Sequence, residues 1–244
     1  MKQGLFEITQ NKPIAENVMQ MCLKGDTSAI TCPGQFINIK LEGRFLRRPI
    51  SVCDVNGDEI TIIYKIVGAG TEQMSCMESG KLDVLTGLGN GYDMSLSGDR
   101  PLLIGGGAGV PPMYMLAKKL IAEGKKVTVI LGFNKKNEMF YEDEFKALGA
   151  DVKVATADGS YGIKGFVTDA MDGVDYTYFY TCGPEPMLKA VYNKSKTSGQ
   201  FSFEERMGCG FGACMGCSCK TITGYKRICK DGPILQKEEI LWED

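Results

Sequence analysis

The chain has 244 residues, and its 28 Lys and Arg against 30 Asp and Glu give a formal net charge of −2. This balance lacks the overall basic character of a nucleic-acid-binding protein, and the absence of histidine excludes His-based catalytic triads and His metal ligands. No N-terminal export signal is visible, and the longest uncharged stretch, residues 102–117, is too short to span a bilayer. We therefore expect a cytoplasmic protein that binds neither nucleic acid nor membrane, in which the 10 cysteines are thiols or metal ligands.

The first part of the chain, residues 1–99, is rich in predicted β-strands. Apolar and polar side chains alternate along four segments, which short turns separate: residues 6–9, 18–23, 36–41 and 60–66. A short helix is expected at residues 71–78. Several short strands at this spacing predict a small antiparallel barrel or sandwich.

Residues 100–200 show a different pattern, in which predicted strands and helices alternate. The strands are expected at residues 102–104, 127–131, 151–155 and 176–181, and the helices at residues 113–122, 138–148, 166–171 and 184–193. This alternation predicts a parallel, doubly wound α/β sheet. The pattern breaks again at residue 201, so residues 201–244 form a third and smaller segment.

The third segment carries a cysteine cluster. Cys209, Cys214 and Cys217 follow the C-x4-C-x2-C spacing of plant-type [2Fe–2S] proteins. The fourth thiolate would come from Cys229, which can fold back over the metal, or from Cys219, which lies only two residues after Cys217. A structural zinc site is the alternative, but the usual second Cys pair is missing from the pattern. The spacing therefore favours an iron–sulfur cluster.

Two loops follow predicted strands and open predicted helices, a context that suits a nucleotide pyrophosphate. The first is a glycine turn that departs from the strict G-x-G-x-x-G fingerprint and lacks the end of a Walker A loop. Because ligands bind at the carboxyl ends of strands in such sheets, we expect both loops to face one crevice. The candidate residues are Gly105, Gly106, Gly107 and Gly109 in the first loop and Cys182, Gly183 and Pro184 in the second.

The segment Arg47-Arg48-Pro49-Ile50-Ser51 is expected to close a strand of the barrel region. The planar guanidinium of an arginine suits phosphate, and a serine hydroxyl adds a hydrogen bond. By itself the Arg-x-x-Ser pattern is weak and favours a solvated basic pair beside a turn.

In combination these motifs resemble the ferredoxin–NADP reductase class, in which an Arg-x-x-Ser segment and two nucleotide loops occur in this order. With the cysteine segment added, the chain resembles the family of dihydroorotate dehydrogenase B electron-transfer subunits over essentially its whole length. The matching segments are residues 46–51, 87–92, 205–210 and 226–233. The resemblance implies a flavin-binding antiparallel barrel (residues 1–99), an NAD-binding α/β domain (residues 100–200) and a [2Fe–2S] segment (residues 201–244).

The resemblance also implies which residues hold the cofactors. For FAD these are Arg48, Pro49, Ile50, Ser51, Ile63, Tyr64, Lys65, Gly70 and Thr71. The wider class often has Tyr at the position of Ile50, so that ring stacking on the flavin must differ here. The family's last cluster cysteine lies in the segment of Cys229, which supports that residue as the fourth ligand. NAD is favoured over NADP, although Asn134-Lys135-Lys136 could meet a 2′-phosphate.

The function implied is electron transfer in pyrimidine biosynthesis. A partner chain with FMN would oxidise dihydroorotate, and electrons would pass through the [2Fe–2S] cluster and FAD to NAD⁺, with no catalytic side chain needed in this chain. The apolar residues Phe211, Ala213 and Met215 are expected to meet that partner in a heterotetramer. The alternatives are a related subunit that exchanges electrons between NAD(P)H and ferredoxin, sulfide or a hydrogenase, and a structural zinc-binding module.

Overall fold

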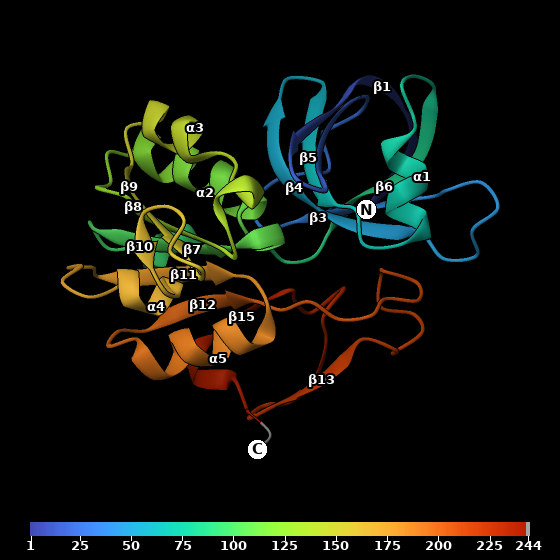
Figure 1. The fold of residues 1–244 in the computed structure, drawn as a ribbon. Coiled ribbons are helices and arrows are strands. Elements are labelled where there is room, and N and C mark those ends of the chain that lie inside the picture. Colours follow the sequence, from blue (N-terminus) through green and yellow to red (C-terminus); the bar gives the residue numbers. More distant parts are fainter. Residues whose placement is uncertain (243–244) are drawn as a thin grey trace.

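In the computed structural model, which describes residues 1–242, the first six strands form a closed antiparallel barrel (Figure 1). Their order around the barrel is β1-β2-β5-β4-β3-β6. The strands are β1 (Lys2–Ala15), β2 (Val18–Lys24), β3 (Phe36–Ile39), β4 (Arg48–Asn56), β5 (Glu59–Lys65) and β6 (Lys81–Leu88). The prediction of an antiparallel barrel is therefore confirmed.

Alternation of side chains explains why the barrel closes. Met21 and Leu23 of β2 and Ile60 and Ile62 of β5 point inward and are fully buried in the barrel core. The helix α1 (Ala69–Ser75) adds the buried side chain of Met74 to the same core.

Two barrel strands differ from the expectation: β6 is additional, and β4 lies later in the chain than expected. The expectation that the Arg47–Ser51 segment closes a strand is wrong, because β4 begins at Arg48 and continues to Asn56, paired along its second half with β5. The Arg-x-x-Ser segment thus opens a strand that is held on both sides, by β3 and by β5.

Beyond the barrel the chain forms a seven-stranded sheet in the order β10-β9-β8-β7-β11-β12-β15, parallel except for its last pair (Figure 1). This confirms the predicted parallel sheet. Its last strand, β15, comes from the C-terminal segment. Its strands are β7 (Pro101–Gly106), β8 (Thr128–Phe133), β9 (Asp151–Thr156), β10 (Ile163–Lys164), β11 (Tyr178–Cys182), β12 (Gly199–Ser202) and β15 (Ile234–Gln236). Its helices are α2 (Pro111–Ala122), α3 (Glu142–Ala147), α4 (Val167–Ala170) and α5 (Glu185–Lys194). Short 3₁₀ turns complete the chain: η1 (Met94–Leu96), η2 (Gly107–Gly109), η3 (Lys136–Glu138) and η4 (Lys237–Glu239).

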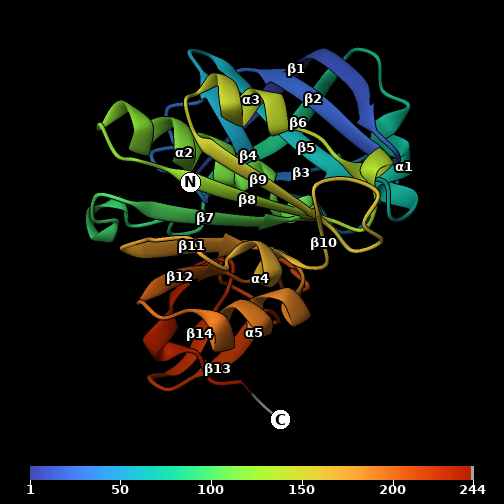
Figure 2. The same ribbon diagram turned by 60° about the vertical axis from the view of Figure 1, so that its left-hand side comes forward.

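Helices cover both faces of this sheet, with α2 and α3 on the barrel side and α4 and α5 on the far side (Figure 2). Leu103 and Tyr180 pack against α2, whereas Ile104 and Phe179 face α4 and α5. No helix among the described residues is long and apolar enough to cross a membrane.

Helix α3 is shorter than expected. The prediction of a helix from residue 138 is wrong at its start, because Tyr141 has a φ of 68°, in the left-handed region, which interrupts a right-handed helix. The chain instead forms the turn η3 and enters α3 at Glu142.

The C-terminal segment leaves the sheet after β12 and returns to its edge as β15, which pairs antiparallel with β12. Between them lie the cysteine loop and a hairpin of β13 (Ser218–Thr221) and β14 (Gly224–Arg227). The cysteine segment is thus an excursion between two adjacent strands.

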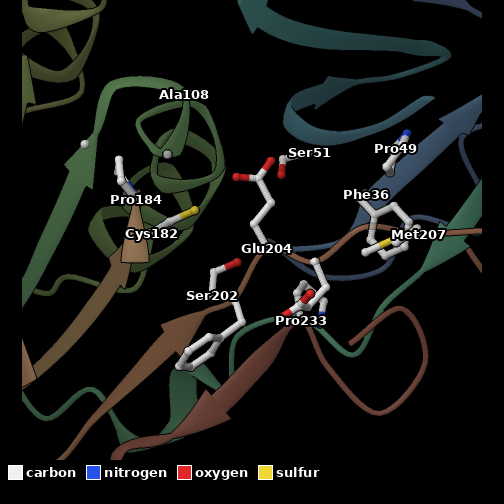
Figure 3. A pocket seen from close by; sticks show the side chains of 15 residues that line it. Phe36, Pro49, Ser51, Ala108, Cys182, Pro184, Ser202, Glu204, Met207 and Pro233 are labelled. Carbon is white, nitrogen blue, oxygen red and sulfur yellow. The ribbon is translucent and has the colours of Figure 1, made fainter. Parts of the chain in front are cut away.

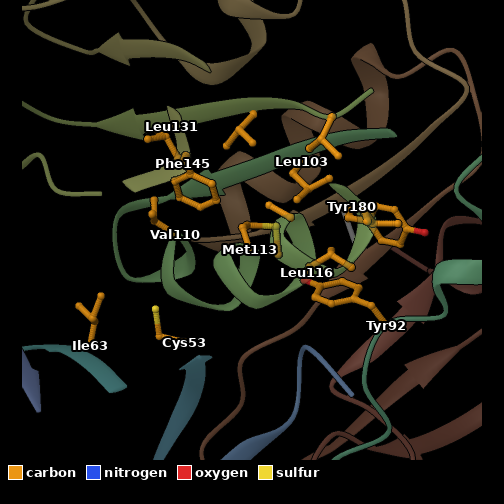
Figure 4. Close-up of a cluster of buried hydrophobic side chains, with 14 of the residues drawn as sticks. Cys53, Ile63, Tyr92, Leu103, Val110, Met113, Leu116, Leu131, Phe145 and Tyr180 are labelled. Atoms are coloured by element: carbon orange, nitrogen blue, oxygen red, sulfur yellow. The ribbon is translucent and has the colours of Figure 1, made fainter. Parts of the chain in front are cut away.

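Tyr92 fixes the barrel against the sheet. It is buried in the segment between the two, and its hydroxyl donates a hydrogen bond of 3.2 Å to the carbonyl of Thr181. Its ring meets that of Tyr180 edge to face, with centroids 5.5 Å apart, within the cluster of buried side chains in Figure 4. Because the Tyr92 N–H also donates a hydrogen bond of 2.8 Å to the carbonyl of Pro33, just before β3, this residue links the barrel to the ends of the parallel strands.

Candidate cofactor-binding sites

A cavity of about 220 Å³ lies where the barrel meets the carboxyl ends of the parallel strands (Figure 3). Strand β4 contributes Pro49 and Ser51, and the two nucleotide loops contribute Gly106, Gly109, Cys182, Gly183 and Pro184. The structure thus brings together at one crevice three motifs that lie far apart in the sequence.

The two nucleotide loops touch each other directly. Gly107 has a φ of +51°, and a Cβ atom on Gly109 would collide with the carbonyl group of Cys182. A Cβ on Gly105 would lie 2.8 Å from the Cα of Val110, where β7 turns towards α2. These glycines permit a left-handed turn and a close approach of two backbones, which leaves room beside the backbone N–H groups.

The thiol of Cys182 faces this crevice as a neutral group. Burial raises its pKa to about 12, although a hydrogen bond with Ser202 acts in the opposite direction. At neutral pH the Cys182 side chain that faces the crevice is therefore the neutral thiol.

The other wall of the cavity was missed by the sequence reasoning. Phe36 of β3 and Ser202, Glu204 and Met207, at and after β12, line it, and Glu204 extends its carboxylate into the cavity (Figure 3). Strand β12 has only four residues and was not predicted, so no signal marked the residues that follow it.

Ile50 does not share the surroundings of its neighbours. It pairs with Ile37 of β3 and packs against the barrel core, whereas Pro49 and Ser51 face the cavity. The aliphatic residue at this position is therefore partly buried against the barrel core.

Arg48, Gly70 and Thr71 come together at the start of α1. The Arg48 guanidinium lies against Gly70, where any Cβ atom would collide with it, and donates a hydrogen bond of 2.6 Å to the carbonyl of Leu46. No carboxylate within residues 1–242 forms an ion pair with it. The Thr71 hydroxyl accepts N–H groups of Val67 and Gly68 and so belongs to the local turn. The group left to meet an anion here is the guanidinium.

Ile63, Tyr64 and Lys65 lie beside Gly107 around a narrow second cavity of about 20 Å³. The Tyr64 hydroxyl donates to Asn11, and Lys65 forms an ion pair of 3.6 Å with Glu138. This strand therefore faces the glycine turn, at a place separate from the first cavity.

The four candidate cluster cysteines form two pairs. Backbone N–H groups of Cys214 and Cys209 each point at the sulfur of the other, at 3.4 and 3.5 Å. The N–H of Cys229 donates to the sulfur of Cys217 at 3.4 Å, and both of these residues are buried. Within the described part of the chain, no group of three or more His, Cys, Asp or Glu side chains is arranged to hold a single metal ion. Two pairs of thiols fit a binuclear cluster, in which four cysteines hold two irons.

The loop stabilises negative charge on sulfur. Burial raises the pKa of Cys209, but N–H groups of Phe211, Cys214 and Ala213 outweigh this effect and lower the pKa to about 6. Such donors suit the thiolate ligands of an iron–sulfur cluster.

Cys219, the rival fourth ligand, lies on β13 opposite Lys226 of the hairpin. Burial raises its pKa, and Glu205 raises it further. Of the two candidates, the structure places Cys229 beside Cys217, so the donor set that fits a cluster is Cys209, Cys214, Cys217 and Cys229.

Comparison with known proteins identifies two domains in the chain. Residues 204–241 match the model of the iron–sulfur cluster binding domain of dihydroorotate dehydrogenase B, and residues 103–193 match that of the oxidoreductase NAD-binding domain. The predictions of an iron–sulfur cluster and of NAD are confirmed at the level of these two domains.

Two solved structures share the fold. At 32% identity, a chain from the structure of an NADH-dependent reduced ferredoxin–NADP oxidoreductase superposes with a TM-score of 0.89, covering 98% of this chain and 90% of that chain. A ferredoxin NADP⁺ reductase from Neisseria gonorrhoeae, at 17% identity, shares the fold with a TM-score of 0.70 over 80% of this chain and 90% of that chain.

Two curated relatives match nearly end to end. Both are named dihydroorotate dehydrogenase B (NAD(+)), electron transfer subunit: one from Bacillus pumilus, 44% identical over 98% of both chains, and one from Fusobacterium nucleatum, 45% identical over 96% of both chains. Together with the cluster-binding domain, this similarity shows that the chain belongs to the family of dihydroorotate dehydrogenase B electron transfer subunits.

Proposed function

We propose that this chain passes electrons from a partner dihydroorotate dehydrogenase to NAD⁺, using a [2Fe–2S] cluster and FAD. The family membership supports this role, as do the paired cysteines and the crevice between barrel and sheet. When bound, FAD supplies two-electron exchange with the nicotinamide and one-electron exchange with the cluster, so the chain itself needs to supply position and electrostatics.

The residues proposed to hold FAD lie on the barrel. Arg48 would meet the pyrophosphate through its guanidinium, which donates to the carbonyl of Leu46 and forms no ion pair within residues 1–242, and Pro49 and Ser51 would bound the flavin from the cavity wall. Ile63, Tyr64 and Lys65 face the glycine turn from the neighbouring strand, β5. Gly70 leaves the space that the Arg48 guanidinium occupies.

The residues proposed to hold NAD lie across the same crevice, in the glycine turn and at Cys182, Gly183 and Pro184. Three contacts support NAD over NADP. Lys135 forms an ion pair of 2.8 Å with Glu16, Asn134 donates to Glu138, and Lys136 lies over the ring of Tyr161. These side chains are therefore already engaged within the protein rather than free for a 2′-phosphate.

One observation carries the proposal. The segment that lines the cavity at Glu204 and Met207 runs on, after a single glycine, into Cys209 of the paired cysteines. The wall of the nucleotide crevice and the cluster loop are thus one continuous stretch of chain, which keeps the two redox sites close to each other.

The partner would dock over the cluster loop. Phe211 and Met215 are 41% and 55% exposed on the same short loop, and neighbouring exposed apolar side chains are typical of an interface. Ala213 lies between them on the same loop. A heterotetramer with an FMN-containing catalytic subunit in the cytoplasm accords with the role of an electron transfer subunit.

The similarity to the ferredoxin–NADP oxidoreductase chain favours a second candidate, electron exchange between NAD(P)H and ferredoxin. Co-expression with a candidate catalytic subunit distinguishes the two functions. Our proposal predicts a stable complex that reduces NAD⁺ when dihydroorotate is added. Ferredoxin reduction by NADH, with no dihydroorotate activity in the complex, would favour the second candidate.

A further inference from the structure

Asn38 connects the barrel to the cluster loop. It lies on β3, is 1% exposed, and its side-chain Nδ2 donates a hydrogen bond of 3.4 Å to the carbonyl of Cys209. This is a contact between two segments that are 171 positions apart in the sequence. A cysteine proposed to bind the cluster is therefore held through its own backbone by a barrel side chain.

The barrel side of this contact is firmly held. Asn38 is paired with Pro49 of β4 and with Leu85 of β6, and its carbonyl accepts a hydrogen bond from the Arg47 guanidinium. That guanidinium also forms an ion pair of 2.9 Å with Asp83. Because Pro49 lines the crevice, the strand pair that bounds the crevice also carries the amide that reaches Cys209.

The loop side is shaped to receive the amide. Gly210 has a φ of +79°, and a Cβ atom there would collide with the Asn38 Nδ2. A residue with a side chain would be strained by the backbone conformation and would push the amide away. The glycine after Cys209 thus leaves the space that the Asn38 side chain fills.

The amide is not explained by stability alone. Its Oδ1 atom is buried and has no hydrogen-bond partner among residues 1–242. An unpaired buried oxygen is unfavourable, and an apolar side chain of similar size would avoid that penalty. What the amide provides, and a leucine would not, is the N–H donor to Cys209.

We propose that Asn38 is a positioning residue that fixes Cys209, and through it the iron–sulfur cluster, relative to the flavin-binding barrel. This inference rests on the proposed function. It assigns to the barrel a role in holding the cluster, in addition to its role in holding FAD. Outer contacts of this kind orient metal ligands, and their loss commonly weakens metal binding by about tenfold or more.

The test compares Asn38→Leu and Asn38→Asp with the unchanged protein, each purified anaerobically with its catalytic partner. In Asn38→Leu we expect unchanged FAD content, about tenfold faster loss of iron to a ferrous chelator, and a broadened electron paramagnetic resonance signal of the reduced cluster. In Asn38→Asp, which has nearly the same shape, a carboxylate facing the Cys209 carbonyl should shift the cluster midpoint potential to a more negative value.

Thr86→Val is the matched control. Thr86 is also 1% exposed on a barrel strand, but its hydroxyl bonds to the carbonyl of Lys2, away from the cluster loop. This variant should keep the normal iron-release rate, spectrum and potential.

If Asn38→Leu and Asn38→Asp both retain FAD and match the unchanged protein in iron release, spectrum and potential, the inference is wrong. Failure of the proposed function has a different signature, since the unchanged protein would then lack FAD or acid-labile sulfide. Should Asn38→Leu not fold, the nearly isosteric Asn38→Asp decides alone through its potential and its spectrum.

Discussion

Arg227 holds Asp231 with two hydrogen bonds, from its Nε at 2.9 Å and from its Nη2 at 3.1 Å. Its third donor, Nη1, bonds at 3.0 Å to the carbonyl of Gly212, in the loop that carries Cys209 and Cys214. One guanidinium therefore ties the first cysteine pair to the turn that presents Cys229.

Arg227→Lys should loosen the cluster without disturbing FAD, because a lysine cannot reproduce a planar fork with three bonded donors. We expect iron loss to a chelator to be about tenfold faster, measured by absorbance after buffer exchange under nitrogen. Arg100→Lys is the matched control, since its ion pair of 2.8 Å with Asp175 is exposed and does not involve the cysteine loop. Equal rates for the two variants would show that the Arg227 bridge is dispensable.

Replacement of single cysteines should separate the ligands from Cys219. Cys209→Ser and Cys229→Ser are expected to abolish the broad visible absorption of the cluster, whereas Cys219→Ser should retain it. FAD should remain in all three variants, because the proposed flavin contacts lie on the barrel. In the complex, dihydroorotate-dependent NAD⁺ reduction should be lost only in the first two. Loss of the cluster absorption in Cys219→Ser, with its retention in Cys229→Ser, would reverse the assignment.

Arg48→Ala should weaken FAD binding by about tenfold or more, because it removes a charge-assisted contact with a phosphate. The dissociation constant is measured by recovery of flavin fluorescence on dilution. Arg44→Ala is a neighbouring control, since Arg44 is already bonded to Gln73 and to the carbonyl of Ala69. A comparable loss in both variants would point to a general effect of positive charge near α1.

The Cys182 thiol should resist alkylation at neutral pH. Burial raises its pKa to about 12 from an ordinary value of 9.0, so the reactive thiolate forms only in strong alkali. The same shift makes the free energy of unfolding depend on pH. The contribution of the neutral Cys182 thiol is fully present below about pH 9 and is lost as the pH rises towards 12, because the thiol ionises first in the unfolded chain. The protein is treated with iodoacetamide at pH 7.5, which is about 4.5 pH units below the pKa of Cys182 in the folded protein. Mass spectrometry should then show modification of the exposed Cys76 before that of Cys182. Rapid labelling of Cys182 would contradict this picture.

The sequence predicted the parts of the fold that repeat a clear pattern. Strands β2 and β5 are short, mostly apolar segments with only rough alternation, and β7, β8 and β11 are apolar runs with glycine or proline nearby, so their approximate positions could be read from the sequence. Strand β4 was obscured because its first residues, Arg48 and Pro49, do not favour a strand by composition. Only pairing with β3 and β5, which lie elsewhere in the chain, makes that segment extended.

The parts of the candidate site that could be predicted are those marked by a characteristic residue spacing or by a local backbone requirement. Cys209, Cys214 and Cys217 carry such a spacing, and the glycine turn carries a local conformational requirement. Asn38 and Glu204 carry neither, since an asparagine in a strand and a glutamate after one are ordinary residues. Their roles arise from tertiary neighbours, which single-sequence reasoning does not reach.

The return of β15 to the edge of the sheet has a practical consequence for redesign. Because β12 and β15 are neighbours, the ends of the cysteine excursion, at Ser202 and Ile234, are paired with each other. A short hairpin turn could therefore replace residues 203–233 and still connect the paired strands β12 and β15. The shortened protein would keep the barrel and the parallel strands, but it would lose the cluster cysteines together with the crevice wall at Glu204 and Met207. The excursion therefore carries both features as one removable unit.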